Sequence, residues 1–419
     1  MREAAVTLAL LAASSCAPAP LIDRAPTSEA ALPGGAEWSA IVPAGWNGIL
    51  LLHSRGYSAS AGSPEPAPRQ YQEKLLAQGY ALAASNYGAG GWALAEAVPA
   101  QEATIAAFAK RYGKPKEVIA YGFSMGGLVT TALAEKPTPS IDGAISFCGS
   151  IGGSIGMMNM GLDGAFTFKT LLAPTSAIEL VGVADDRANG ALVQAAVQDA
   201  KASAAGRARL VLAATLGGIP AWVPAMAGES PGDRQDREVD ALIKAFPMGI
   251  FLPRSEQEQR TGIGYSWNEG IDYSALLARS GREDFVRSVY RSAGLDLAQD
   301  LEKLAQAPRI HPEQGAVDYM TKNYVPTAVP RIPMLAVQNL GDFVTSPSLQ
   351  ESYAERATPG MFKSLYLPQA GHCTFSADQM LDAISIVERR MRRGAWPKEI
   401  GKDVDLKPPP MPRGSNNPP

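Results

Sequence analysis

The sequence predicts an α/β fold in which a mostly parallel central sheet, with helices on both faces, is interrupted by a large helical cap. Short and almost wholly apolar runs alternate with amphipathic segments as far as residue 150. Strands of this kind are buried on both faces, as in a parallel sheet. The alternation stops at Gly149 and resumes at Ile332. We therefore expect a cap inserted between the sixth and seventh strand positions, with an independent second domain as the alternative.

Each element is predicted from its own pattern. Gly48–His53 is a continuous apolar run, which indicates a buried strand. Arg69–Gln78 places Tyr71, Leu75 and Leu76 at helical spacing. The other expected strands lie at 37–42, 80–85, 118–121, 141–148, 333–337 and 362–367, and further core helices lie at 101–111, after residue 127 and at 378–393. In the cap we expect helices at 192–204, 207–216, 239–246, 273–279, 284–293 and 296–305.

The two ends of the chain have sequence patterns that differ from those of the predicted core. Arg2 precedes an apolar run, Ala4–Ala13, and then small residues, which is typical of a secretory signal. Cys16 follows a segment similar to a bacterial lipoprotein box without its usual leucine, so a lipid anchor at Cys16 is an alternative. We expect a secreted or periplasmic protein with a signal peptide at 1–18, a linker at 19–36, core segments at 37–150 and 332–400, a cap at 151–331 and a disordered tail at 401–419.

Composition excludes some partners. The chain of 419 residues has a formal net charge of -3 at pH 7, which argues against nucleic acid as the main partner. Beyond the N-terminal run, no segment is long and apolar enough to predict an integral membrane span. Hydrophobic residues make up 46% of the chain, which allows a sizeable core.

The strongest functional motif is the segment Glu117–Leu128, which reads EVIAYGFSMGGL. A strand pattern leads into Gly-x-Ser-x-Gly around Ser124, and an amphipathic helical pattern follows, which is the context of a nucleophile elbow. The same pattern recurs around Ser154. No clear amphipathic helix start follows there, so we interpret the second match as a glycine-rich loop and Ser124 as the nucleophile.

A base and an acid follow Ser124 in the chain. His372 comes directly after the last expected strand and is the candidate general base. Asp342 follows the seventh strand position, from which its carboxylate can orient the imidazole. His53 ends a strand on the other side of the sheet and suits an oxyanion-loop role better, and His311 is expected at the surface.

An oxyanion hole needs two backbone donors. Met125 supplies one, and we expect the other from the segment 53–57, at the N–H of Arg55. Ser54 stands where glycine is common, so the second donor can also be the residue one position before or after Arg55. The Arg55 side chain is expected either at the substrate or in solvent.

The cysteines and several bulky residues also gather near the expected site. Cys148 ends the strand beside the elbow strand and Cys373 adjoins His372, which predicts a disulfide; the alternative is two small buried thiols. Most bulky apolar cap residues are expected in the cap core, and some of them in an apolar acyl or aromatic pocket. The substrate-binding candidates are His53, Tyr57, Tyr87, Trp92 and Met157.

The segments Trp46–Tyr57, Gly122–Gly127 and Gly371–Phe375 together resemble those of secreted bacterial hydrolases of the α/β-hydrolase superfamily. The resemblance covers residues 37–150 and 332–393 and leaves the cap uncovered. It implies an α/β-hydrolase fold and a triad of Ser124, Asp342 and His372. It further implies a carboxylic-ester hydrolase that acts on a small-molecule ester through an acyl-enzyme, without a metal or cofactor.

Other functions are left open by these residues. A peptidase or amidase would use the same triad, and Glu269, Asp272 and Arg279 are available in the cap to hold a peptide terminus. A polyester- or tannase-like depolymerase is a third hypothesis. The large cap argues against it, because a polymer needs an open cleft. A non-catalytic binding protein on the same scaffold would usually have lost a member of the triad.

Overall fold

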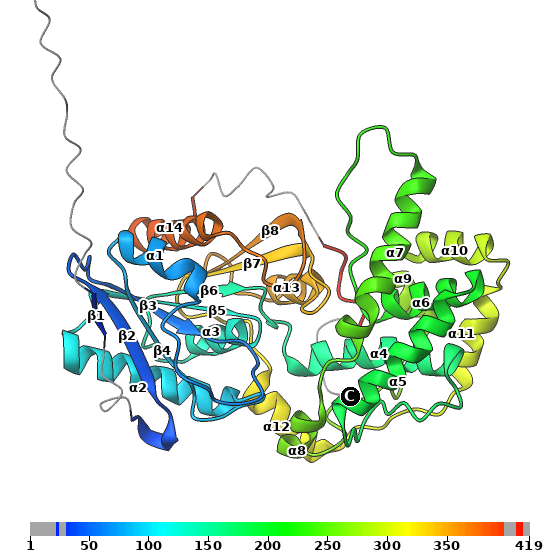
Figure 1. Cartoon of the computed structure of the whole chain (residues 1–419), viewed down its shortest axis with the longest axis horizontal. Coiled ribbons are helices and arrows are strands. Elements are labelled where there is room, and N and C mark those ends of the chain that lie inside the picture. The colour runs from blue at the N-terminus through cyan, green and yellow to red at the C-terminus, as the bar shows by residue number, and fades with distance from the viewer. Residues whose placement is uncertain (1–21, 25–30, 398–407, 414–419) are drawn as a thin grey trace, which may run out of the picture.

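The computed structural model describes residues 22–24, 31–397 and 408–413 (Figure 1). The predicted signal peptide at 1–18 and the candidate lipid-anchor residue Cys16 lie outside the described residues. Within the described part of the chain, no helix combines the length and apolarity needed to cross a membrane.

In the described ranges of the chain, eight strands form one central sheet, in the order β1-β2-β4-β3-β5-β6-β7-β8. The strands β3 to β8 run parallel to one another, whereas β2 pairs antiparallel with both β1 and β4 at one edge. The predicted mostly parallel sheet is therefore confirmed. The strands are β1 (Ile22–Arg24), β2 (Trp38–Pro43), β3 (Ile49–Ser54), β4 (Ala81–Ser85), β5 (Glu117–Phe123), β6 (Gly143–Phe147), β7 (Met334–Gly341) and β8 (Phe362–Ala370).

Helices cover both faces of this sheet (Figure 1). On one face α1 (Arg69–Ala77) and α14 (Ala377–Arg393) pack against residues such as Leu51 and Ile119. On the other face α2 (Leu94–Tyr112), α3 (Met125–Glu135) and α13 (Pro347–Ala354) pack against residues such as Leu50 and Val118. Successive residues of one strand thus enter different cores, which is why the central strands are apolar at nearly every position.

The chain between β6 and β7 is helical throughout its regular structure and lies to one side of the sheet (Figure 1). Its inserted helices are α4 (Ser154–Leu172), α5 (Asp186–Lys201), α6 (Ala204–Leu216), α7 (Pro231–Ile250), α8 (Ser255–Thr261), α9 (Tyr273–Arg279), α10 (Glu283–Ser292), α11 (Leu297–Gln306) and α12 (Gln314–Tyr324). They have a core of their own around α6, where Leu210, Val211 and Leu212 are fully buried. The division into hydrolase core and cap at 150/151 and 331/332 stays a prediction.

The start of the insertion differs from the expected glycine-rich loop. Ser154 is instead the first residue of α4, and every residue from Ser154 to Phe168 is buried. A helix enclosed on all sides has no polar face, so it carries no amphipathic pattern for sequence analysis to detect. The loop interpretation of the second Gly-x-Ser-x-Gly match is therefore wrong, and Ser154 starts a buried helix.

Two other segments have more structure than their composition indicated. In the predicted linker, Ile22–Arg24 pairs with β2, because an edge strand presents unpaired backbone groups that a short segment can satisfy. In the tail predicted to be disordered, Met411 is buried to 2% exposure, and Arg413 forms an ion pair with Asp163 of α4. The disordered-tail prediction is wrong for residues 408–413, because the inserted helices provide a site for them.

Candidate active site

Ser124 lies in the turn between β5 and α3, at the carboxyl end of a central strand. Its backbone adopts φ 57° and ψ −122°, a combination that non-glycine residues rarely take and that is found at functional sites. Neighbouring glycines make this turn sterically feasible. A Cβ at Gly122 would lie 2.1 Å from the carbonyl oxygen of Gly126, and a Cβ at Gly126 would lie 2.0 Å from that of Ser54. Strand, strained serine and helix form the predicted elbow.

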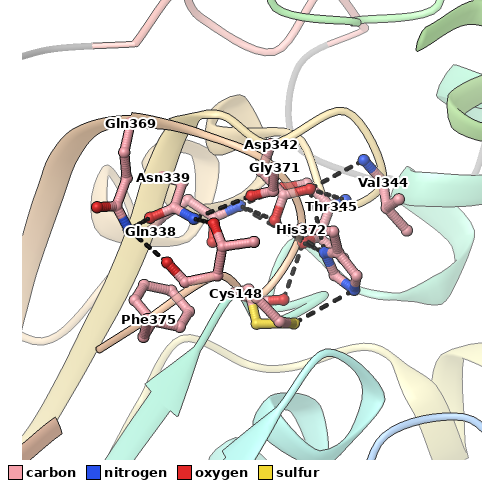
Figure 2. Close-up of a disulfide and its surroundings, with 12 residues drawn as sticks. Cys148, Gln338, Asn339, Asp342, Val344, Thr345, Gln369, Gly371, His372 and Phe375 are labelled. Carbon is pink, nitrogen blue, oxygen red and sulfur yellow. Dashed lines mark hydrogen bonds and ion pairs between the residues drawn. A yellow bond between two sulfur atoms is a disulfide. The ribbon is translucent and has the colours of Figure 1, made fainter. Parts of the chain in front are cut away.

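Asp342 and His372 meet at the same edge of the sheet (Figure 2). Asp342 follows β7 and is fully buried, and His372 follows β8 with 23% of its side chain exposed. The His372 Nδ1 lies 2.9 Å from Oδ2 and 3.1 Å from Oδ1 of Asp342. A neutral imidazole that donates its Nδ1–H to this carboxylate presents an unprotonated Nε2 on its other side.

These three residues therefore stand at the carboxyl ends of β5, β7 and β8, in the chain order Ser, Asp, His. That order, on a strand-elbow-helix turn in a mostly parallel sheet, is the arrangement of α/β-hydrolases. The chain has the α/β-hydrolase fold. The fold implied by the sequence resemblance is thus confirmed.

The hydrolase-fold core holds the Asp342 carboxylate with several donors that sequence reasoning missed. The amides of Val344 and Thr345 donate to Oδ1 at 2.9 and 3.1 Å, and the Thr345 hydroxyl lies 3.0 Å from Oδ2. Gln338 reaches Oδ2 from β7 with its Nε2 at 3.4 Å. An aspartate that accepts from amides two and three residues later forms a local turn, and this spacing was the available sequence signal.

The predicted disulfide between Cys148 and Cys373 is present, with a Cα–Cα distance of 5.4 Å. It joins the loop after β6 to the His372 loop across 225 residues of sequence (Figure 2). The Nε2 atom of His372 lies 3.3 Å from Cys373 Sγ. The bridge therefore lies directly against the ring of the candidate base.

Ser124 and His372 both line one cavity of about 380 Å³. The predicted contacts Tyr57, Trp92 and Met157 also line it, as does Met125. The sheet-containing core and the inserted helical region both contribute to the cavity wall. Met157, Leu252, Pro253 and Gln257 belong to the insertion. Gly56, Phe123 and Cys373, which belong to predicted segments of the site, line it too. Lining residues that the sequence did not indicate are Ser150, Leu252, Pro253, Gln257, Val344 and Thr345.

Two of the predicted substrate contacts lie elsewhere. His53 is 3% exposed, stacks on Tyr121 with ring centroids 5.2 Å apart, and has its Nδ1 2.9 Å from the carbonyl oxygen of Glu65. Burial lowers its pKa to about 4, so His53 is neutral at physiological pH. Tyr87 is also buried, and its hydroxyl donates to the carbonyl of Arg55. Both side chains point into the protein, because β3 and the loop after β4 are covered on both faces.

The Arg55 side chain does not line the cavity either. Its guanidinium donates to the carbonyls of Gly56, Asn86 and Ala89, and lies 4.6 Å from the centre of the Tyr87 ring. It therefore holds two loops together. Gly56 of this segment lies against the serine, since an added Cβ there would be 3.5 Å from Ser124 Cβ.

The chain is similar in sequence or structure to several known hydrolases. The chain is 28% identical over 417 residues to an o-phthalyl amidase of Xanthobacter agilis, and the match covers 89% of each chain. Among solved structures it is similar to feruloyl esterase B from Aspergillus oryzae, with 12% identity, a TM-score of 0.40, and coverage of 86% of this chain and 78% of the esterase. It is also similar to Candida antarctica lipase A, with 14% identity, a TM-score of 0.40, and coverage of 87% and 74%. No protein-family model matches the chain.

Proposed function

We propose that the protein is a serine hydrolase that transfers an acyl group to water through an acyl-enzyme. One observation carries the proposal: Ser124 on its strained elbow and His372 held by the buried Asp342 open onto the same cavity. A serine in such a position needs an adjacent base to become nucleophilic, and the base needs an orienting partner. The proposed roles are nucleophile for Ser124, base for His372 and orienting acid for Asp342.

In the first half-reaction, Ser124 Oγ attacks the substrate carbonyl carbon and its proton passes to His372 Nε2. The tetrahedral intermediate collapses when His372 returns this proton to the leaving alcohol or amine. Water then attacks the acyl-enzyme, gives its proton to His372, and releases the acid and free Ser124. Asp342 stays ionised throughout and stabilises the imidazolium. The proposed reaction uses no metal or cofactor.

The intermediate's oxyanion requires two backbone donors. One is the N–H of Met125, the first residue of α3, at the positive end of the helix. For the second we propose the segment Arg55–Tyr57, with Gly56 rather than Arg55 as the residue next to Ser124. The Arg55 side chain holds this segment in place through carbonyls of the neighbouring loop.

The cavity favours an uncharged acyl group. Among the described residues that line it, none carries a permanent charge, and aromatic, methionine, leucine and proline side chains form much of the wall. Two charged residues next to lining residues in the sequence are engaged elsewhere: Glu256 pairs with Arg260 at 2.8 Å, and Arg55 binds carbonyls. An acyl group with its own carboxylate would enter without a cationic partner. We therefore propose esters of neutral apolar acids as the main substrates.

Amide cleavage is a second candidate, favoured by the likeness to an o-phthalyl amidase along 89% of the chain. The same residues serve both reactions, because His372 can protonate a leaving amine as well as an alcohol.

The disulfide also supports the proposed secreted or periplasmic location, since such bonds persist in oxidising compartments.

The test is a rate profile across p-nitrophenyl esters of increasing acyl length, beside p-nitroanilides with benzoyl and 2-carboxybenzoyl groups. We expect fast cleavage of neutral esters, slower cleavage of the benzoyl anilide, and the slowest cleavage of the 2-carboxybenzoyl anilide. Anilide rates equal to ester rates would make the protein an amidase. A preference for 2-carboxybenzoyl would contradict the neutral cavity.

Two serine variants separate the elbow from its sequence duplicate. Ser124→Ala should lower kcat at least about a thousandfold and abolish fluorophosphonate labelling, because the nucleophile is lost. Ser154→Ala is the matched control, since this serine starts α4 and does not line the cavity; it should keep most of the activity. Activity that survives in Ser124→Ala would move the nucleophile elsewhere.

A further inference from the structure

Three metal-ligating atoms lie together at the candidate active site. The Sγ atoms of Cys148 and Cys373 and a ring nitrogen of His372 are all within 4.8 Å of one another. We propose that reduction of the disulfide turns this group into a binding site for a zinc-class divalent cation, which inactivates the enzyme by occupying His372. The metal site itself stands on its own geometry, whereas the inactivation rests on the proposed function.

The histidine is already arranged as a metal ligand. Asp342 accepts the Nδ1–H of His372 at 2.9 Å, so the lone pair of Nε2 faces away from the carboxylate. A carboxylate that fixes the tautomer in this way is the usual hydrogen-bond partner of a zinc-bound histidine. Nε2 lies 3.3 Å from Cys373 Sγ. Tetrahedral zinc with bonds of about 2.0–2.3 Å holds its ligands about 3.3–3.8 Å apart, so this pair already has nearly the required separation.

The remaining sulfur needs only a local change. A dithiol reductant breaks the S–S bond, supplies two electrons and two protons, and is itself oxidised to a disulfide. Zn²⁺ then displaces the two thiol protons to solvent and accepts electron pairs from both thiolates and from Nε2. The sulfurs must separate to about 3.8 Å around the metal. Water in the cavity can fill the fourth position, as in zinc sites with three protein ligands.

Backbone contacts independent of the disulfide keep the two cysteine segments in place. The Cys148 amide donates to the carbonyl of Val337 at 2.8 Å. The Asn339 side chain donates to the carbonyl of Gly371 at 2.9 Å, beside the His372 loop. The reduced protein should therefore retain the ligands near their present positions. In that state the metal holds the lone pair that must accept the Ser124 proton, so hydrolysis stops.

The experiment uses the full chain with Cys16→Ser, which leaves Cys148 and Cys373 as the only cysteines. The protein is reduced with a dithiol, freed of reductant under nitrogen, and titrated with Co²⁺ as a spectroscopic substitute for Zn²⁺. We expect one Co²⁺ per chain with thiolate charge-transfer bands and the visible bands of tetrahedral cobalt. Equimolar Zn²⁺ should displace it and lower ester hydrolysis at least tenfold. The oxidised protein should show neither effect, and chelation followed by reoxidation should restore activity.

Variants keep the two proposals distinguishable. Ser124→Ala should bind Co²⁺ normally without any activity, so the metal site can be confirmed even if the proposed hydrolase function fails. Cys148→Ser should lose the spectrum of two thiolates, and His372→Ala should lose tight binding. Absence of tetrahedral cobalt bands in the reduced chain, equal binding by the oxidised chain, or loss of the near-UV circular dichroism signal on reduction would each overturn the metal site.

Discussion

Thr345 and Asp342 are joined twice, because the Thr345 amide donates to Oδ1 at 3.1 Å and its hydroxyl lies 3.0 Å from Oδ2. The same hydroxyl lies 2.8 Å from the carbonyl of Cys148 and 3.3 Å from His372 Nδ1. A hydroxyl has one proton to donate, so it satisfies either the carboxylate or the Cys148 carbonyl at a given moment. Thr345 thus connects the disulfide loop to the carboxylate that orients His372 (Figure 2).

Thr345→Val should lower kcat about 10- to 100-fold while changing KM less, because a hydrogen bond to a charged group contributes about 1.5–3 kcal/mol. Thr345→Ser restores the hydroxyl and should recover most of the rate. Steady-state kinetics on one neutral ester measures both variants. Equal losses in the two variants would instead assign Thr345 a packing role.

Asp342→Asn should lower kcat by about 10³–10⁴ with the fold intact, because an amide favours the wrong imidazole tautomer. The exposed residue Asp284 provides a matched control, and Asp284→Asn should leave the rate unchanged. Circular dichroism monitors the fold and p-nitrophenyl ester kinetics the rate. A near-wild-type rate in Asp342→Asn would place the orienting acid at another position.

The ion pair between Arg413 and Asp163 predicts a pH dependence of stability, because it contains a buried carboxylate. The Nε–Oδ2 distance is 2.9 Å, with side-chain exposures of 8% and 1%. Burial raises the Asp163 pKa to about 6, against the opposing effect of Arg413. Because the folded-state pKa exceeds the unfolded value, the contribution of Asp163 to stability falls as pH rises from about 4 to about 6 and is level above it.

Arg413→Met should extend this fall beyond pH 6, because the carboxylate then lacks its cationic partner. The free energy of unfolding should drop below that of the wild type by up to about 1.4 kcal/mol for each pH unit between 6 and 8. Urea unfolding at several pH values measures it. Arg393→Met, at an exposed arginine, is the control, and adding Asp163→Asn to Arg413→Met should remove the pH dependence. A difference that does not change with pH would contradict the buried pair.

His53 should lower the free energy of unfolding as pH falls, whereas the Asp163 contribution falls as pH rises. The His53 folded-state pKa of about 4 lies below the ordinary histidine pKa of 6.5, so its contribution to stability is complete above pH 6.5 and is lost as pH falls to about 4. The loss should reach about 3 kcal/mol. His53→Asn should therefore flatten the decline in unfolding free energy over this range, whereas His311→Asn, at an exposed histidine, should not. Parallel declines in wild type and His53→Asn would show that His53 is already protonated in the folded protein.

Several features were predictable because they depend on local pattern. The sharp turn at Ser124 was predicted from its flanking glycines. The structure shows the collisions that a side chain would cause at Gly122 and Gly126. The pairing of Cys148 with Cys373 followed from their positions at strand ends. Helix α4 was missed because it is buried on all sides and thus lacks a polar face. The roles of Ser124, Asp342 and His372 remain predictions, now with a geometry that supports them.

The sequence by itself determined the fold class, the elbow at Ser124 and the order of its candidate partners, because strand burial, turn sterics and chain order are properties of short segments. Only the tertiary structure decided what surrounds those residues. It directed His53 and Tyr87 into the protein, placed Gly56 against Ser124, and fixed Arg413 beside Asp163. Such contacts join segments far apart in the chain, and no local pattern specifies which distant surface a side chain will meet.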